Sequence, residues 1–239
     1  MRRWFWLLGL LIPLAVVAAS MALAPVINGA VLCAPERCTS YTQILQPIPN
    51  TRVEQVEFRA PNGNKMYGVY FKQHKARYTV LLNHDATGNM ITALPLAMAM
   101  IEGGCSVFIY DYEGFGMSEG TASLDTMVAD GDAAFDCAMN QLRIKPSHII
   151  AGGSGLGSCV ANVMVDHNPV SGLIMIDAPN RVNDIVSTKT GWWTVFAPRM
   201  HDYETRVPSI LKLPSVELTT HGGSPEALAG QINTFIRKF

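Results

Sequence analysis

The residue types that could perform chemistry in this chain stand near the ends of predicted strands. Ser154 comes shortly after a predicted strand at 148–151, Asp177 directly follows one at 172–176, and His221 follows a weak one at 216–220. A serine hydroxyl attacks an acyl carbon once a histidine takes its proton, and an acid orients that histidine. Ser154, Asp177 and His221 are therefore candidate catalytic residues.

The elements that must position these residues alternate between strands and helices. The predicted strands cover 53–58, 67–72, 78–83, 106–110, 148–151, 172–176 and 216–220, and the predicted helices cover 92–102, 124–141, 158–166 and 227–239. Asn62-Gly63 is a tight-turn signal between the first two strands. This order predicts an α/β fold, a mostly parallel sheet with an opening antiparallel hairpin. In such sheets, sites form where strand C-terminal ends meet helix N-termini.

Three strand-end segments carry motifs in a characteristic order. They are His84-Asp85-Ala86-Thr87-Gly88-Asn89, then Asp111-Tyr112-Glu113-Gly114-Phe115-Gly116-Met117-Ser118-Glu119-Gly120, then Gly153-Ser154-Gly155-Leu156-Gly157. Together they resemble the α/β-hydrolase superfamily, most closely its membrane-anchored members related to serine aminopeptidases and monoacylglycerol lipases. The resemblance covers 53–187 well and the last 50 residues poorly. It implies an α/β-hydrolase fold with a shortened C-terminal part, and a hydrolase activity.

The chain departs from that family at the nucleophile. The family carries G-x-S-x-G on a sharp strand-to-helix turn, and an ungapped match puts Gly155 at the serine position, with Ser154 one residue early. The resemblance implies that the backbone N–H groups of Ala86 and Leu156 form the oxyanion hole. Asp85 stands where relatives have glycine, and a carboxylate that pointed into the hole would repel a developing oxyanion.

The acid and the base are also incomplete. His221-Gly222 matches the pair that precedes the family's acid, but Pro225 then stands at the acid position. Alternatively, the last strand ends at residue 220, and Ser224 stands where the catalytic histidine is expected. Asp177 and His221 form a possible dyad without a nucleophile. Otherwise Asp177 caps backbone N–H groups at a strand end, and His221 is a surface loop residue.

Two functions from different classes follow. In the first, a membrane-tethered α/β-hydrolase-like protein with a degraded triad acts by binding a small acyl-type ligand or a protein partner. In the second, an active serine hydrolase (an esterase, thioesterase or peptidase) uses Ser154 or a water activated by His221. A third interpretation, in which Gly155 replaces the serine of an active enzyme, leaves Asp85 and Ser224 unexplained.

The N-terminal region predicts a membrane segment. Residues 4–32 contain no charge and follow Arg2 and Arg3, and a bilayer needs about 20 apolar residues. We expect domains at 1–32 (membrane anchor or signal segment), 33–52 (tether) and 53–239 (α/β-hydrolase-like domain). The positive-inside rule puts the domain on the exported side. Cleavage after Ala22-Leu23-Ala24 would make the protein secreted, and lipidation at Cys33 is a further alternative.

Composition excludes several classes of protein. Of the 239 residues only 15% are charged and the net charge is −1, which argues against a nucleic-acid partner. No dinucleotide fingerprint, P-loop or metal-ligand spacing occurs, so we expect no cofactor and no metal. Cys33 and Cys38 are close enough in sequence to form a disulfide in an oxidising compartment, or they remain unpaired thiols.

Overall fold

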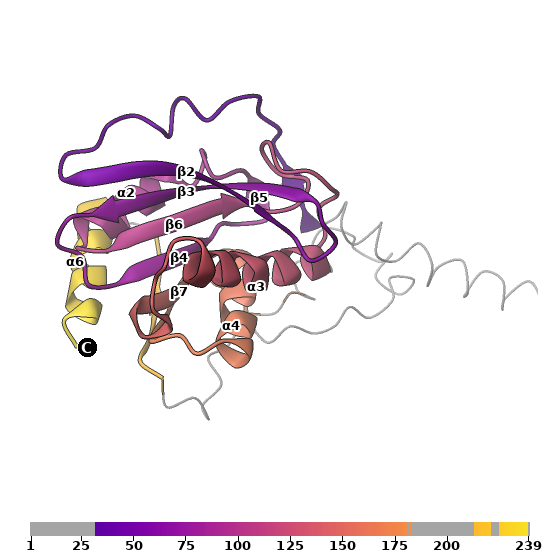
Figure 1. The fold of residues 1–239 in the computed structure, drawn as a ribbon. Helices are drawn as coiled ribbons and strands as arrows, with labels where there is room; N and C mark the ends of the chain where they lie inside the picture. The colour runs from indigo at the N-terminus through magenta and orange to yellow at the C-terminus, as the bar shows by residue number, and fades with distance from the viewer. Residues whose placement is uncertain (1–31, 181, 183–212, 221–224, 239) are drawn as a thin grey trace, which may run out of the picture.

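A computed structural model describes residues 32–180, 182, 213–220 and 225–238 of the chain (Figure 1). In this part, seven strands form one sheet in the order β2-β3-β6-β4-β7-β8-β9. The strands are β2 (Thr51–Arg59), β3 (Lys65–Gln73), β4 (Thr79–Asn83), β6 (Ser106–Asp111), β7 (Ile149–Ser154), β8 (Gly172–Ile176) and β9 (Ser215–Leu218). Pairing is antiparallel from β2 to β6 and parallel from β6 to β9. The predicted α/β fold is confirmed.

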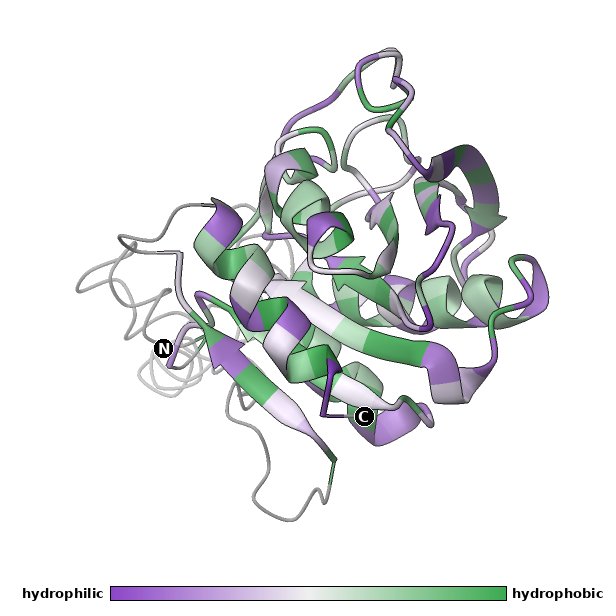
Figure 2. Cartoon of the chain, turned by 90° about the vertical axis from the view of Figure 1, so that its left-hand side faces the viewer, coloured by the Kyte–Doolittle hydropathy of each residue, from purple (hydrophilic) through white to green (hydrophobic). Residues whose placement is uncertain are grey.

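The hairpin at one edge and the central strands differ in burial, as their sequences require. In β2 the residues of TRVEQVEFR alternate in polarity, and only Val56 is fully buried. All residues of β4, β6 and β8 are buried, because helices cover both faces of the sheet at its centre. Figure 2 shows the hydrophobic residues gathered on these central strands and the helices that flank them.

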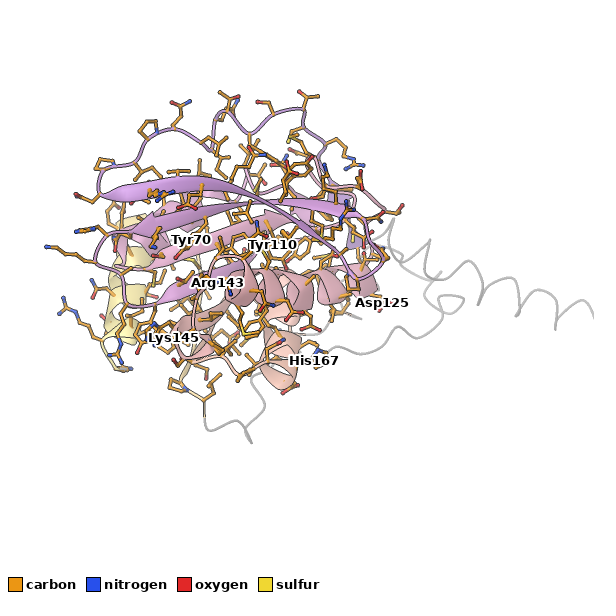
Figure 3. The ribbon with its side chains drawn as sticks, in the orientation of Figure 1. Tyr70, Tyr110, Asp125, Arg143, Lys145 and His167 are labelled. Carbon is orange, nitrogen blue, oxygen red and sulfur yellow. The ribbon has the colours of Figure 1, made fainter. Side chains whose placement is uncertain are left out.

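The helices pack in pairs. α3 (Leu124–Asn140) contacts α4 (Gly157–His167), and α2 (Leu94–Glu102) contacts α6 (Pro225–Ile236). The core accordingly divides into two clusters, one containing Tyr110 and Phe135 and the other containing Ile109 and Ile232. Neighbouring residues of β6 thus point to opposite faces of the sheet. In Figure 3, Tyr70 and Tyr110 lie at the sheet, whereas Asp125 and His167 lie on the helices in front of it.

Local sequence signals account for where several elements begin. The Ser123 hydroxyl accepts a hydrogen bond from the Thr126 N–H at 3.1 Å, and the Thr126 hydroxyl accepts one from the Ser123 N–H at 3.0 Å. The two bonds form a capping box at the start of α3. Ser123 is therefore the N-cap of α3. The final helix begins at Pro225, two residues earlier than the sequence predicted, because proline suits a first helical position.

Residues 33–52 differ from the expected tether, because parts of this segment pack on the domain. A short strand, β1 (Ala34–Pro35), pairs in parallel with β5 (Thr87–Gly88), which belongs to the loop after β4. The Tyr41 side chain is buried, and its hydroxyl donates to Asp111 Oδ2 at 2.6 Å. The boundary at residue 53 therefore excludes residues that belong to the folded unit.

The structure also bears on the predicted disulfide and on the predicted membrane segment. No disulfide joins any of the five cysteines, all of which lie among the described residues, so the Cys33–Cys38 disulfide is absent; Cys33 lies buried beside Met127 instead. Residues 4–31 of the predicted anchor lie outside the described residues. Among the described residues, no helix is long and apolar enough to cross a bilayer.

Candidate active site

The loops after β4, β7 and β8 meet at one edge of the sheet, because these strands are parallel neighbours. Asn83 at the end of β4 stands opposite Gly153, and Ser154 at the end of β7 stands opposite Ile176. The motif-bearing segments thus come together although about 70 residues separate the first two in sequence. This is the edge at which open α/β sheets form their sites.

The turn between β7 and α4 is tight enough to require its glycines. A Cβ atom on Gly153 would lie 2.5 Å from the carbonyl carbon of Gly157, and one on Gly157 would lie 2.7 Å from the carbonyl carbon of Asn83. Gly155, between them, has φ +54°, the left-handed region that glycine adopts without strain. The structure therefore places Gly155 at the apex of the turn between strand and helix.

The carboxylate of Asp85 lies against this apex. A Cβ atom on Gly155 would lie 2.5 Å from Asp85 Cγ, so the carboxylate fills the space that a side chain at 155 would enter. Asp85 Oδ1 accepts a hydrogen bond from the Leu156 N–H at 2.8 Å, and Asp85 Oδ2 accepts one from the Thr87 hydroxyl at 2.9 Å. The Asp85 carboxylate therefore points toward the expected oxyanion hole.

The two backbone groups expected to form the oxyanion hole have different surroundings. The Leu156 N–H stands at the N-terminus of α4 and already donates to Asp85, where the helix dipole favours a negative charge. Ala86 is fully buried, and its carbonyl accepts a hydrogen bond from the Ala34 N–H at 2.8 Å. One of the two expected donors is thus occupied by a carboxylate of the chain itself.

The other candidate residues are distributed around the same edge. Ser154 ends β7, is half-buried and lines the cavity described below. Asp177 has φ +49° and accepts a hydrogen bond from the Thr220 N–H at 2.9 Å and one from the Thr220 hydroxyl. Asp177 therefore bridges the ends of β8 and β9. His221 and Ser224 lie outside the described residues.

His84 has a structural environment. Its ring is 1% exposed, with Nδ1 2.6 Å from the carbonyl oxygen of Asp85 and Nε2 3.4 Å from Asp111 Oδ1. The Tyr112 hydroxyl donates to the His84 carbonyl at 3.0 Å, and burial raises the pKa of Tyr112 well above its usual value, so this phenol stays protonated. These contacts fix the backbone immediately before Asp85.

A cavity of about 450 Å³ opens beside these residues. Its volume suits a small molecule. Its polar wall includes Asp85, Thr87, Ser154, Asp177 and Thr220, and its apolar wall comes from α2 and α6, including Pro95, Leu96, Ala99, Ala227 and Leu228. Sequence reasoning did not identify the two threonines that hold the carboxylates. The Asp85–Thr87 bond joins residues two positions apart, whereas the Asp177–Thr220 pair depends on the contact between β8 and β9 and has no local signal in the sequence.

Comparison with known proteins agrees with this fold. Residues 74–210 match the family described as serine aminopeptidase, S33. The chain is 28% identical over 130 residues to YfhR of Salmonella typhi, covering 52% of this chain and 44% of YfhR. It is 27% identical over 179 residues to the alpha/beta hydrolase domain-containing protein 17B of Xenopus tropicalis, covering 71% of this chain and 58% of that protein. The chain thus spans about half the length of these curated relatives.

Solved structures share the architecture at low sequence identity. An esterase of Pyrococcus furiosus, Pf2001, aligns with a TM-score of 0.64 and 15% identity over 87% of this chain and 97% of that one. An alpha-beta hydrolase of Vibrio vulnificus aligns with a TM-score of 0.65 and 18% identity over 90% of this chain and 81% of that one. At such identities the likeness shows the fold alone. With the match of residues 74–210, it follows that this chain belongs to the serine aminopeptidase S33 family of the α/β-hydrolase superfamily.

Proposed function

We propose that this protein is a non-catalytic member of its family that binds a small ligand in the cavity beside Asp85. The observation that carries the proposal is the position of the Asp85 carboxylate, which fills the space of a side chain at 155 and accepts the Leu156 N–H. A serine hydrolase needs a nucleophile at this apex and free donors for the oxyanion. Gly155 supplies no nucleophile, and Asp85 occupies one expected donor with a negative charge.

The electrostatics of the site strengthen this argument. A tetrahedral intermediate of acyl transfer carries a negative oxygen, which in this family would sit against the Leu156 N–H. Two unit charges a few ångströms apart in a partly buried site repel each other by about 4 kcal/mol. The loss of the nucleophile and the occupation of the hole act on the same step. Together they oppose acyl transfer more strongly than either change alone.

Fluorophosphonate labelling of the full-length protein in membranes tests the proposal. This probe reacts with activated serines, so we expect no labelling of the native chain and no turnover of a panel of p-nitrophenyl esters above background. The matched control is Ser154→Ala, which removes the adjacent hydroxyl in the sequence without changing the residue at the apex. Labelling of the native protein, mapped by mass spectrometry to any residue of the turn at 153–157, would overturn the proposal.

One observation favours a second candidate function, an active hydrolase that uses Ser154. The Ser154 side chain is half-buried and lines the cavity that Asp177 also lines, so a hydroxyl and a carboxylate face one ligand space. Under this alternative, the native protein hydrolyses acyl esters and Ser154→Ala abolishes the activity. If turnover is present and survives Ser154→Ala, a water-based mechanism involving His221 takes its place.

We further propose that residues 4–32 tether the domain to a membrane, with the domain on the exported side. The support is the uncharged run of 29 residues after Arg2 and Arg3. Alkaline carbonate extraction of cell membranes checks the tether, and protease digestion of intact spheroplasts checks the side. Release of the full-length chain by carbonate, or protection of the domain from protease in intact spheroplasts, would contradict it. A shortened chain in the medium would indicate cleavage.

A further inference from the structure

The hydrogen-bonding character of the site beside Gly155 is inverted relative to a serine hydrolase. An oxyanion hole presents N–H donors to an oxygen of the ligand. Here the Leu156 N–H donates to Asp85 Oδ1, so the group that remains to face a ligand is a carboxylate. An ionised carboxylate accepts about four hydrogen bonds, and the described residues supply two, from Leu156 and Thr87.

The charge of Asp85 is not balanced by a cation of the described residues. Both of its hydrogen-bond donors are neutral, no described salt bridge involves it, and no lysine or arginine is among the described residues that line the cavity. The N-terminus of α4 contributes the Leu156 N–H but no positively charged side chain to this carboxylate. A ligand that donates hydrogen bonds and carries a positive charge would complement this carboxylate.

The rest of the cavity defines the other half of such a ligand. Besides the polar wall, α2 and α6 present proline, leucine and alanine side chains, and burying alkyl groups of a ligand against such a surface is favourable. Resting on the proposed binding function, we propose that the cavity takes an organic ammonium: a protonated amine held by Asp85, carried on a short apolar group that packs against α2 and α6.

Three probes of similar size test the ligand class. Butylammonium, 1-butanol and butyrate each contain four carbon atoms and differ in the charge of the head group. They are titrated at pH 7 onto the full-length protein in lipid nanodiscs, with empty nanodiscs as the blank, and binding is followed by ligand-observed NMR. We expect butylammonium to bind at least about tenfold more tightly than 1-butanol, and butyrate to bind most weakly. Equal or tighter binding of butyrate, or no binding of butylammonium, overturns the proposal.

Asp85→Asn tests the residue. The amide keeps the shape, can accept from the Leu156 N–H and can donate to the Thr87 hydroxyl, so the loop keeps its bonds while the charge is lost. We expect butylammonium affinity to fall about tenfold and 1-butanol affinity to stay unchanged. The matched control is Asp136→Asn, which removes an exposed carboxylate of α3 that does not line the cavity. Equal butylammonium affinity in the native and Asp85→Asn proteins overturns the assignment to Asp85.

The two proposals fail differently. Fluorophosphonate labelling or ester turnover by the native protein removes the non-catalytic function, whatever the probe series shows. Absence of labelling together with a preference for butyrate leaves the binding function standing and removes only the ammonium class.

Discussion

The carboxylate of Asp85 lies directly against Gly155 and fills the position that any side chain at 155 would enter. The two residues come from loops 70 positions apart in the sequence, and the Leu156 N–H joins them through its bond to Asp85 Oδ1. Each residue therefore accounts for the other. A glycine at 155 leaves room for the carboxylate, and a serine at 155 would require the carboxylate to move.

This relationship predicts a strong energetic coupling between the two positions. Gly155→Ala should lower the free energy of unfolding by about 3 kcal/mol, because it combines left-handed backbone strain with a clash against Asp85. In an Asp85→Gly background the same substitution should lower it by only about 1 kcal/mol, since the clash is gone. Urea unfolding of the four proteins measures the difference.

Gly104 supplies the matched control for this cycle. It has φ +97°, and a Cβ atom placed on it meets nothing within 4 Å. Gly104→Ala should therefore show the strain alone, about 1 kcal/mol, with or without Asp85. Equal losses for Gly155→Ala in both backgrounds would mean that the carboxylate does not occupy the apex in solution.

A buried acid in α3 predicts a pH dependence of stability. Asp130 is fully buried, and burial raises its pKa from 3.8 to about 8; the nearby Glu113 carboxylate adds to the rise, and a bond from the Glu113 N–H opposes it. The folded state therefore holds a proton that the unfolded state releases near pH 4. This contribution to stability is full below pH 4 and is lost progressively as pH rises toward 8.

Asp130→Asn should remove this loss of stability at higher pH, because the amide does not titrate. Between pH 5.5 and pH 8, the native protein should lose about 3 kcal/mol more unfolding free energy than the variant. Asp136→Asn, on the exposed side of the same helix, is the control and should follow the native curve. Urea unfolding at both pH values provides the measurement, and parallel pH profiles for the native and Asp130→Asn proteins would show that Asp130 titrates normally.

The burial of the cysteines predicts how many thiols react in the folded and in the unfolded protein. Cys38 is partly exposed, the other four are buried, and burial raises the pKa of Cys105, Cys137 and Cys159 to about 12. Ellman's reagent should modify at most one thiol of the native protein within minutes, and Cys38→Ala should abolish that reaction. Under denaturing, non-reducing conditions all five should react. A count of three would reveal a disulfide that the structure does not contain.

Removing the hydroxyl of Tyr41, in the segment before β2, should destabilise the protein. The buried Tyr41 hydroxyl donates to Asp111 Oδ2 at 2.6 Å and accepts from the Met117 N–H at 2.8 Å. Tyr41→Phe leaves both groups without this partner and should lower the free energy of unfolding by about 2 kcal/mol. Tyr67→Phe is the control, because its hydroxyl forms no hydrogen bond among the described residues. Equal stability of the two variants would favour a loosely attached tether.

Several features of this protein could be predicted from the sequence because they depend on neighbouring residues. Alternating strand and helix patterns give the α/β class, and Ser123 with Thr126 marks the start of α3. The glycines at 153, 155 and 157 predict a tight turn, and the sequence has glycine and not serine at position 155. Short-range periodicity and backbone sterics are enough for each of these inferences.

Other features needed the tertiary structure, because they depend on residues that only folding brings together. The sequence shows an aspartate at 85, but the direction of its carboxylate depends on the distance between the loops after β4 and β7. The contact of Tyr41 with Asp111 likewise cannot be seen in a segment whose sequence predicts a tether. The composition of the cavity wall depends on α2 and α6 meeting across more than 120 residues. Local preferences decide which elements form, and long-range packing decides which side chains face one another.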